Sequence, residues 1–354
     1  MVIEEGSHNE LMENETQNRR MFELQANQYN WRKIIMISEL YRCAAVFSAK
    51  NILVYRDGQY SKAVISNKIN GQILVGDYLS CEIIYEQIYA NKIVRRKNLI
   101  RRLQAGKMQK LAANVDVVFI VTSANQDFNL ARLERYYILA KESSVRICFV
   151  LSKVDLIDNY EELVNIIAER FPGIFVEKTS IYQSNTEVSL FNHWHEKETA
   201  IFLGSSGVGK SSLINLMLEN EVIKTKNIRE SDGHGRHTTT ARHIYILPNQ
   251  RVVIDTPGLR SVGISAKADT IDELFPEIKE LENKCKYNNC SHLSEPGCAI
   301  REAIDKEEMD YNRYLRYLKL VGDEAKRQTL LKGKSYEKEK IIKELKSHRK
   351  SNRR

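Results

Sequence analysis

One short segment constrains the fold of this 354-residue chain more than any other. An apolar run, TAIFLG, leads into Gly204-Ser205-Ser206-Gly207-Val208-Gly209-Lys210-Ser211-Ser212. The segment fits G-x-x-x-x-G-K-S, which joins a strand to a helix. Glycines let successive backbone N–H groups turn inward around phosphate oxygens, and the helix N-terminus adds its positive end. The segment therefore predicts a phosphate-binding loop, in which Lys210 binds the β- and γ-phosphates and Ser211 ligates Mg²⁺.

The sequence around this loop alternates between apolar runs and amphipathic stretches. The expected strands are VDVVFIVTSA, VRICFVLSKVDL, IFVEKTS, TAIFLG, ARHIYILP and QRVVIDTPG. The expected helices are LARLERYYILAKES, YEELVNIIAERF and one that begins near Lys210. This rhythm predicts a three-layer α/β domain with a parallel sheet, which we place at residues 106–272.

Two further motifs end strands of this domain. The first is Asp255-Thr256-Pro257-Gly258. The Asp255 carboxylate is expected to lie near Mg²⁺ without binding it directly, and Gly258 is expected to point its backbone N–H toward a γ-phosphate. Ser152-Lys153-Val154-Asp155 resembles the Asn-Lys-x-Asp motif by which GTPases recognise guanine. A carboxylate at Asp155 accepts two hydrogen bonds from guanine, whereas adenine lacks that donor pattern. Lys153 is expected to pack along the base.

Ser152 stands where the guanine motif usually has Asn, so we expect that contact to be altered. Thr179 and Ser180, at the end of another strand, are expected to contact the base side. In an ordinary small GTPase the phosphate loop precedes the guanine motif, but in this chain the phosphate loop follows the guanine motif. This order indicates a circular permutation, which a compact domain tolerates when its original ends lie close together.

A cluster of three of the six cysteines and one histidine lies within fourteen residues. Its members are Cys285, Cys290, His292 and Cys298. Thiolates and imidazole nitrogens are preferred ligands of Zn²⁺, and four of them leave no open position. The cluster therefore predicts one structural zinc ion, in a domain that we place at residues 273–330. Cys43, Cys81 and Cys148 lie in apolar runs and are expected in the core.

Residues 36–105 show short apolar runs separated by turn signals. Asp57-Gly58 and Asn70-Gly71 are typical of hairpin turns. Four or five strands in this length predict a small β-barrel, either an oligonucleotide-binding (OB) fold or an SH3-like barrel. Residues 1–35 are polar and are expected to form a flexible tail.

The net charge of +8 is unevenly placed along the chain. Residues 92–110 hold eight Lys or Arg and no acid, whereas residues 1–30 hold six acids and two Arg. The tail 331–354 is also basic, with ten Lys or Arg against three Glu from residue 332. Two basic blocks indicate a polyanionic partner. No apolar run approaches the roughly 18 residues of a membrane helix, and the acidic start predicts no secretory signal.

The succession of SKVD, GSSGVGKSS, GRHTTT, DTPG and the Cys/His cluster resembles the ribosome small subunit-dependent GTPase A family. The resemblance covers about residues 38–330. It implies an N-terminal OB-fold, a circularly permuted P-loop GTPase domain and a small α-helical zinc domain. It also implies the small (30S) ribosomal subunit and its rRNA as partners, with GTP hydrolysis in late subunit assembly.

Two residues of GRHTTT take roles from this resemblance. Thr239 is expected to close over Mg²⁺ and the γ-phosphate, and Lys210 is a further expected catalytic residue. Leu259 stands where many GTPases carry a glutamine that orients water, so slow intrinsic hydrolysis is expected, and His237 is the implied substitute. We expect a cytoplasmic monomer that binds GTP and GDP and no membrane. The alternatives are a nucleotide-gated RNA-binding module whose hydrolysis only times release, a P-loop ATPase, and a permuted GTPase of another ribosomal particle.

Overall fold

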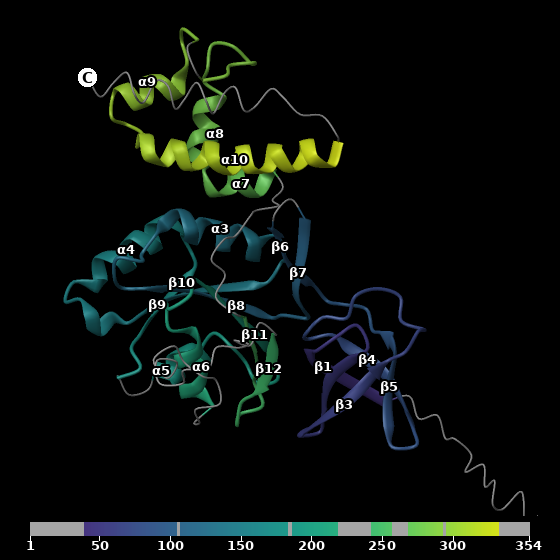
Figure 1. Ribbon diagram of the computed structural model, residues 1–354. Coiled ribbons are helices and arrows are strands. Elements are labelled where there is room, and N and C mark those ends of the chain that lie inside the picture. Colours follow the sequence, from purple (N-terminus) through teal and green to yellow (C-terminus); the bar gives the residue numbers. More distant parts are fainter. Residues whose placement is uncertain are drawn as a thin grey trace, which may run out of the picture.

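The computed structural model describes residues 39–104, 107–182, 186–218, 242–256, 268–292 and 295–332. Figure 1 shows three parts in chain order: a small barrel, a sheet covered by helices, and a helical module stacked on one helical layer. The predicted architecture of barrel, α/β domain and helical module is thereby confirmed.

The N-terminal part is a closed five-stranded barrel. Its strands are β1 (Glu39–Val46), β2 (Asn51–Arg56), β3 (Gln59–Ile65), β4 (Tyr78–Ile84) and β5 (Gln87–Ile93). Strand β1 pairs with both β2 and β4, while β5 joins β3 to β4, so no edge is left open within the barrel. This order is that of the predicted OB-fold. Cys43 and Cys81 lie in its core, as expected.

Of the two hairpin turns predicted for the barrel, one is present and the other is not. Asp57 and Gly58 adopt φ values of 49° and 86° in the β2–β3 turn, as a tight hairpin requires. Asn70-Gly71 does not form a hairpin, because it lies in the long connection between β3 and β4, which do not pair with each other. The β4–β5 turn uses Tyr85 and Glu86 at φ 48° and 65°.

The central domain contains strands of the sheet and the helices that cover it. The strands are β8 (Val117–Ser123), β9 (Arg146–Ser152), β10 (Phe175–Thr179), β11 (Thr199–Gly204), β12 (His243–Ile246) and β13 (Val252–Asp255). The helices are α3 (Leu130–Lys141), η1 (Val154–Leu156), α4 (Tyr160–Arg170), α5 (Thr186–Phe191) and α6 (Lys210–Met217). The strand order is β10-β9-β8-β11-β13-β12.

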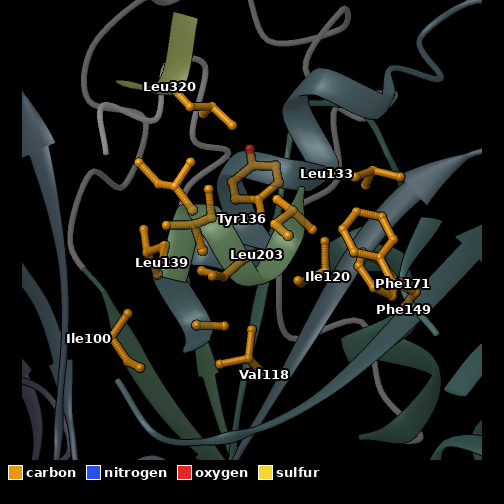
Figure 2. Close-up of a cluster of buried hydrophobic side chains, with 14 of the residues drawn as sticks. Ile100, Val118, Ile120, Leu133, Tyr136, Leu139, Phe149, Phe171, Leu203 and Leu320 are labelled. Carbon is orange, nitrogen blue, oxygen red and sulfur yellow. The ribbon is translucent and has the colours of Figure 1, made fainter. Parts of the chain in front are cut away.

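Side chains alternate between the two faces of this sheet. Val118 and Ile120 face a cluster that includes α3 and α4, whereas Phe119 faces the cluster that includes α5 and α6. Figure 2 shows the first cluster, in which Tyr136 and Leu139 of α3 pack over the sheet. Three layers result, with helices on both faces, as the alternating sequence predicted.

The expectation of a wholly parallel sheet is wrong at one edge. Strands β8, β9, β10, β11 and β13 are parallel, but β12 is antiparallel to β13. Only residues 247–251 separate these two strands, and so short a connection cannot cross over to a parallel neighbour. Ala45 of β1 pairs with His243 of β12, so the barrel continues the sheet.

Part of the basic segment 92–110 lies on a separate hairpin between barrel and sheet. Strand β6 (Leu99–Gln104) pairs antiparallel with β7 (Lys107–Ala113). The hydroxyl of Ser143, just after α3, lies 3.3 Å from the carbonyl of Leu99, which ties the hairpin to α3. Residues 105–106, where we placed a domain boundary, lie outside the described residues.

The described residues of the C-terminal module form four helices. They are α7 (Ala268–Leu274), α8 (Pro276–Glu282), α9 (Ala299–Asp305) and α10 (Tyr311–Lys332). Tyr314, Tyr317 and Leu320 of α10 join the hydrophobic cluster that also contains α3, and Figure 2 shows Leu320 near Tyr136. Within the described parts of the chain, no helix has the length and apolarity needed to cross a membrane.

Candidate nucleotide site and metal cluster

The predicted nucleotide-binding segments meet at one edge of the sheet. Ser123 of β8 pairs with Ser152 of β9, and Ser152 pairs with Thr179 of β10. On the other side of β8, Gly204 of β11 pairs with Val121. All these strands are parallel, so their carboxyl ends lie together, where α/β sheets bind ligands.

Glycines shape the loop between β11 and α6. A Cβ atom on Gly204 would lie 2.4 Å from the carbonyl oxygen of Val121, so only glycine allows β11 to approach β8 this closely. Gly207 and Gly209 have φ values of 86° and 98°, a region that side chains disfavour. The loop therefore curls before α6 begins at Lys210, with Ser211 and Ser212 in the first turn and Ser206 exposed.

Lys210 is buried beneath the loop, with 5% of its surface exposed. Its Nζ donates to the carbonyls of Gly204 at 3.0 Å and Ser205 at 2.6 Å. Burial lowers the pKa of Lys210 to about 8, and the charge of Asp255 opposes that shift. Burial likewise raises the pKa of Asp255, opposed by Lys210. Each charge therefore favours the charged form of the other group, at the end of β13.

The SKVD segment is hydrogen-bonded to the phosphate loop. The Ser152 hydroxyl is buried, 2.6 Å from the carbonyl oxygen of Val208 and 3.0 Å from that of Thr122. Lys153 Nζ donates to the carbonyl of Gly207 at 2.7 Å. Serine at the usual Asn position therefore still ties the segment to the loop.

Three other residues expected on the base side differ in exposure. Asp155 lies in η1 and is exposed. Thr179 and Ser180 are buried at the end of β10, and the Ser180 hydroxyl accepts from the backbone N–H of Tyr182 at 3.2 Å. Among the described residues, the Thr179 hydroxyl has no hydrogen-bond partner. The site therefore presents an exposed carboxylate beside buried hydroxyl groups.

Three predicted site residues, His237, Thr239 and Gly258, lie outside the described residues. The sequence analysis also missed a contact on the loop, because nothing in the helical stretch LARLERYYILAKES marks one residue as special. Arg132 of α3 donates to the Ser205 hydroxyl at 2.6 Å. It lies three residues after Asn129, which caps α3 and whose side chain accepts from the Arg132 backbone N–H.

The Cys/His cluster forms one compact centre in the C-terminal module. The ligand atoms of Cys285, Cys290, His292 and Cys298 all lie within 4.8 Å of one another. Nδ1 of His292 lies 3.5 Å from the sulfurs of Cys285 and of Cys298. Three thiols and an imidazole at this spacing fit a tetrahedral metal ion. The chain therefore brings together a donor set suited to metal binding.

A carboxylate lies behind the histidine of this cluster. Glu282 Oε1 is 3.8 Å from Nε2 of His292 and accepts from the Tyr317 hydroxyl at 2.9 Å. Carboxylates that face the outer nitrogen of a ligand histidine orient its ring toward the metal. The centre is thereby connected to α8 and α10.

Comparison with known proteins agrees with this arrangement. A family model described as RsgA GTPase matches residues 93–265. A protein from Vibrio parahaemolyticus named small ribosomal subunit biogenesis GTPase RsgA 2 is 39% identical over 254 residues, covering 71% of this chain and 70% of its own length. One from Leptospira interrogans, named small ribosomal subunit biogenesis GTPase RsgA, is 33% identical over 315 residues, covering 82% and 86%.

Solved structures support the fold. YjeQ from Thermotoga maritima aligns with a TM-score of 0.54 at 23% identity, covering 82% of this chain and 99% of its own. YloQ, described as a circularly permuted GTPase, aligns with a TM-score of 0.54 at 23% identity, covering 85% and 97%. Together with the two relatives above 30% identity, these matches show that the chain belongs to the RsgA GTPase family and is a circularly permuted, GTP-hydrolysing enzyme.

Proposed function

We propose that this GTPase acts in ribosome biogenesis by binding the small (30S) subunit and its rRNA late in assembly. Subunit binding would stimulate hydrolysis of GTP to GDP and phosphate. One observation carries the nucleotide site: Ser152 and Lys153 contact the carbonyls of Val208 and Gly207. The base segment and the phosphate loop are thus joined, as one nucleotide bound across both would require. The names of the Vibrio and Leptospira relatives support the partner.

Each predicted residue has a role in this proposal. The glycine-rich loop, residues 204–212, binds the phosphates, Lys210 neutralises the β- and γ-phosphates, and Ser211 ligates Mg²⁺. Asp255 acts on Mg²⁺ from outside its direct ligands, and the base contacts come from residues 152–155 with 179–180. Thr239, Gly258 and the hydrolytic His237 complete the site at the γ-phosphate.

The remaining parts supply the contacts to the subunit. The barrel, the basic segment 92–110 and the basic tail 331–354 would hold rRNA through phosphate contacts. The Cys/His cluster would hold a structural Zn²⁺, which gives the small C-terminal module rigidity that its size alone does not provide. We propose a cytoplasmic monomer divided at residues 36–105, 106–272 and 273–330.

Turnover of GTP and of ATP, each with and without purified small subunits, tests the function. We expect GTP hydrolysis to rise strongly with small subunits and ATP hydrolysis to stay low. Absence of stimulation would overturn the proposal, and equal stimulation by large subunits would indicate another ribosomal particle. Subunit release that follows GTP binding rather than hydrolysis would instead favour a nucleotide-gated RNA-binding module.

The pH dependence of nucleotide binding tests the role of Lys210. The pKa of this side chain is lowered to about 8 by burial, so it carries its charge below that pH and loses it above. Bound phosphates favour the charged form, so GTP affinity should fall as pH rises through about 8. Lys210→Ala should bind GTP weakly and without this dependence, and an unchanged profile in this variant would contradict the assignment.

A further inference from the structure

An arginine outside every recognised motif contacts the phosphate loop. Arg132 lies in the first turn of α3, and its guanidinium Nη1 donates to the Ser205 hydroxyl at 2.6 Å. The Asn129 side chain accepts from the Arg132 backbone N–H at 3.0 Å, which caps the helix at this point. Because a capped helix end is fixed in position, the reach of Arg132 to the loop is fixed with it.

Ser205 is held by a second side chain of the same helix. Tyr136, one turn beyond Arg132 and 1% exposed, forms a hydrogen bond with the Ser205 side chain. Burial raises the pKa of Tyr136 to about 12, while that hydrogen bond and the Arg132 charge oppose the shift. Tyr136 is thus a neutral partner at any ordinary pH. The Ser205 hydroxyl lies between two groups that project from one face of α3.

This contact marks one end of the loop. The carbonyls of Gly204 and Ser205 receive the Lys210 ammonium, which in such loops reaches the β- and γ-phosphates. Ser152 and Lys153 contact the other end of the loop. The loop is therefore held at both ends, by the base segment at one and by α3 at the end nearest the γ-phosphate.

The guanidinium also brings charge to that end. Within the described residues, the Arg132 guanidinium forms no ion pair with a carboxylate, and besides Ser205 it contacts the Asp127 carbonyl, 3.5 Å from Nη1. Its positive charge therefore adds to that of Lys210 beside the loop. Arginine charge near transferring phosphates stabilises the negative charge that develops there.

We infer that Arg132 is a positioning residue for GTP hydrolysis, which acts through Ser205 to fix the Lys210 end of the phosphate loop. The inference rests on the nucleotide site proposed above. Loosening this end displaces the carbonyls on which the Lys210 ammonium rests and hence the group that faces the γ-phosphate. GDP has no γ-phosphate, so its affinity depends less on this end than the rate of hydrolysis does.

The test compares Arg132→Gln, Ser205→Ala and the double variant in the full-length protein. Single-turnover GTP hydrolysis and GDP affinity are measured for each. We expect Arg132→Gln to slow hydrolysis by about 10- to 100-fold, as a displacement of roughly 1 Å does, while GDP affinity changes by less than about 3-fold. Ser205→Ala should change the rate of hydrolysis and the GDP affinity in the same directions as Arg132→Gln does. The double variant should be no slower than Ser205→Ala, because removal of the Ser205 hydroxyl already breaks the contact that Arg132→Gln removes.

Arg132→Lys separates charge from geometry. Lysine keeps the positive charge but lacks the forked donor, so hydrolysis should be restored only in part. Arg146→Gln is the matched control. Arg146 opens β9 at the opposite edge of the sheet, where it pairs with Glu198 and donates to the His193 carbonyl. This variant should hydrolyse GTP at the parent rate.

Three results would overturn the inference. The first is a hydrolysis rate in Arg132→Gln within about 2-fold of the parent rate. The second is a double variant in which the two single effects multiply. The third is a loss of GDP affinity in Arg132→Gln as large as its loss of hydrolysis rate. If Arg132→Gln fails to fold, as thermal unfolding would report, Ser205→Ala decides alone, since it removes one hydroxyl from a half-buried loop. If Lys210→Ala binds GTP as tightly as the parent does, the proposed site itself is refuted. If Lys210→Ala loses GTP affinity but Arg132→Gln hydrolyses GTP at the parent rate, only this inference is refuted.

Discussion

The barrel and the C-terminal module both pack against the central domain, but different chemistry holds them there. At the barrel, backbone groups dominate: Ala45 pairs with His243, and the Ala113 N–H donates to the Val75 carbonyl at 3.1 Å. The buried Arg42 of the barrel donates to the neutral Thr199 hydroxyl. This contact region, here called the barrel seam, extends the sheet into the next part of the chain.

The C-terminal module is held by charged side chains instead. Glu134 of α3, 1% exposed at its side chain, accepts from Arg170 of α4 at 2.7 Å and from Arg316 of α10 at 3.2 Å. Arg170 also donates to the carbonyl of Leu274 and lies 4.4 Å from the ring centroid of Phe275. This region, the module seam, therefore joins two α-helices of the GTPase domain to the module through one carboxylate.

The two seams are expected to differ in how sensitive they are to single substitutions. Backbone pairing fixes register and tolerates most side-chain changes, whereas a buried carboxylate shared by two arginines depends on each partner. Burial lowers the pKa of Arg170, and the Glu134 charge opposes that shift more than the Glu277 charge does. The module seam is thus expected to be the more sensitive of the two to single substitutions.

The largest effect is expected where the module depends on its metal. Cys298 occupies the N-cap position of α9 and belongs to the Cys/His cluster, so Cys298→Ser should lose the proposed Zn²⁺ and with it folding free energy on the order of 10 kcal/mol within the module. Metal content, together with hydrogen exchange in α8 and α9, measures this. Cys148→Ala, in the buried sheet, is the control and should retain the metal. Full metal content in Cys298→Ser would refute the zinc site.

The local motifs of this chain could be predicted from the sequence, but the contacts at the module seam could not. The glycine-rich loop between a strand and a helix and the clustering of Cys285, Cys290, His292 and Cys298 were predictable because each is a local pattern with its own chemistry. Glu134 was not, because it lies 182 residues from Arg316, and on an amphipathic helix a charge usually faces water. Likewise the Tyr85-Glu86 turn carries none of the Gly or Asn that mark such turns, while Asn70-Gly71 carries both and forms a loop.

The module seam itself is tested by Glu134→Gln. The substitution keeps the shape but leaves Arg170 buried without its anion, so the free energy of unfolding should fall by about 3–5 kcal/mol. Chemical denaturation measures the loss. Glu161→Gln is the matched control, because Glu161 pairs with Lys178 at the surface and its removal should cost less than about 1 kcal/mol. Equal losses in the two variants would show that the seam does not depend on its buried charge.

The barrel seam has one position where even a methyl group should matter. Gly76 has a φ of 90°, and a Cβ there would lie 2.2 Å from the carbonyl oxygen of Ala113. Gly76→Ala should therefore reduce the free energy of unfolding by about 2–3 kcal/mol, from backbone strain and a clash that backbone must absorb. Gly173→Ala separates the two causes, since Gly173 also has positive φ but open space around it. A loss no larger than that of Gly173→Ala would leave strain as the only cause.

The smallest effect is expected from a side chain at the same seam. The Tyr60 hydroxyl donates to the Ile244 carbonyl at 3.3 Å, and 43% of the residue is exposed. Water can replace this donor, so Tyr60→Phe should lower the free energy of unfolding by no more than about 1 kcal/mol. Tyr85→Phe, at the 91% exposed turn residue, should cost nothing measurable in the same denaturation experiment. If Tyr60→Phe instead matched Gly76→Ala, side chains rather than backbone pairing would hold the barrel, and the two seams would not differ in kind.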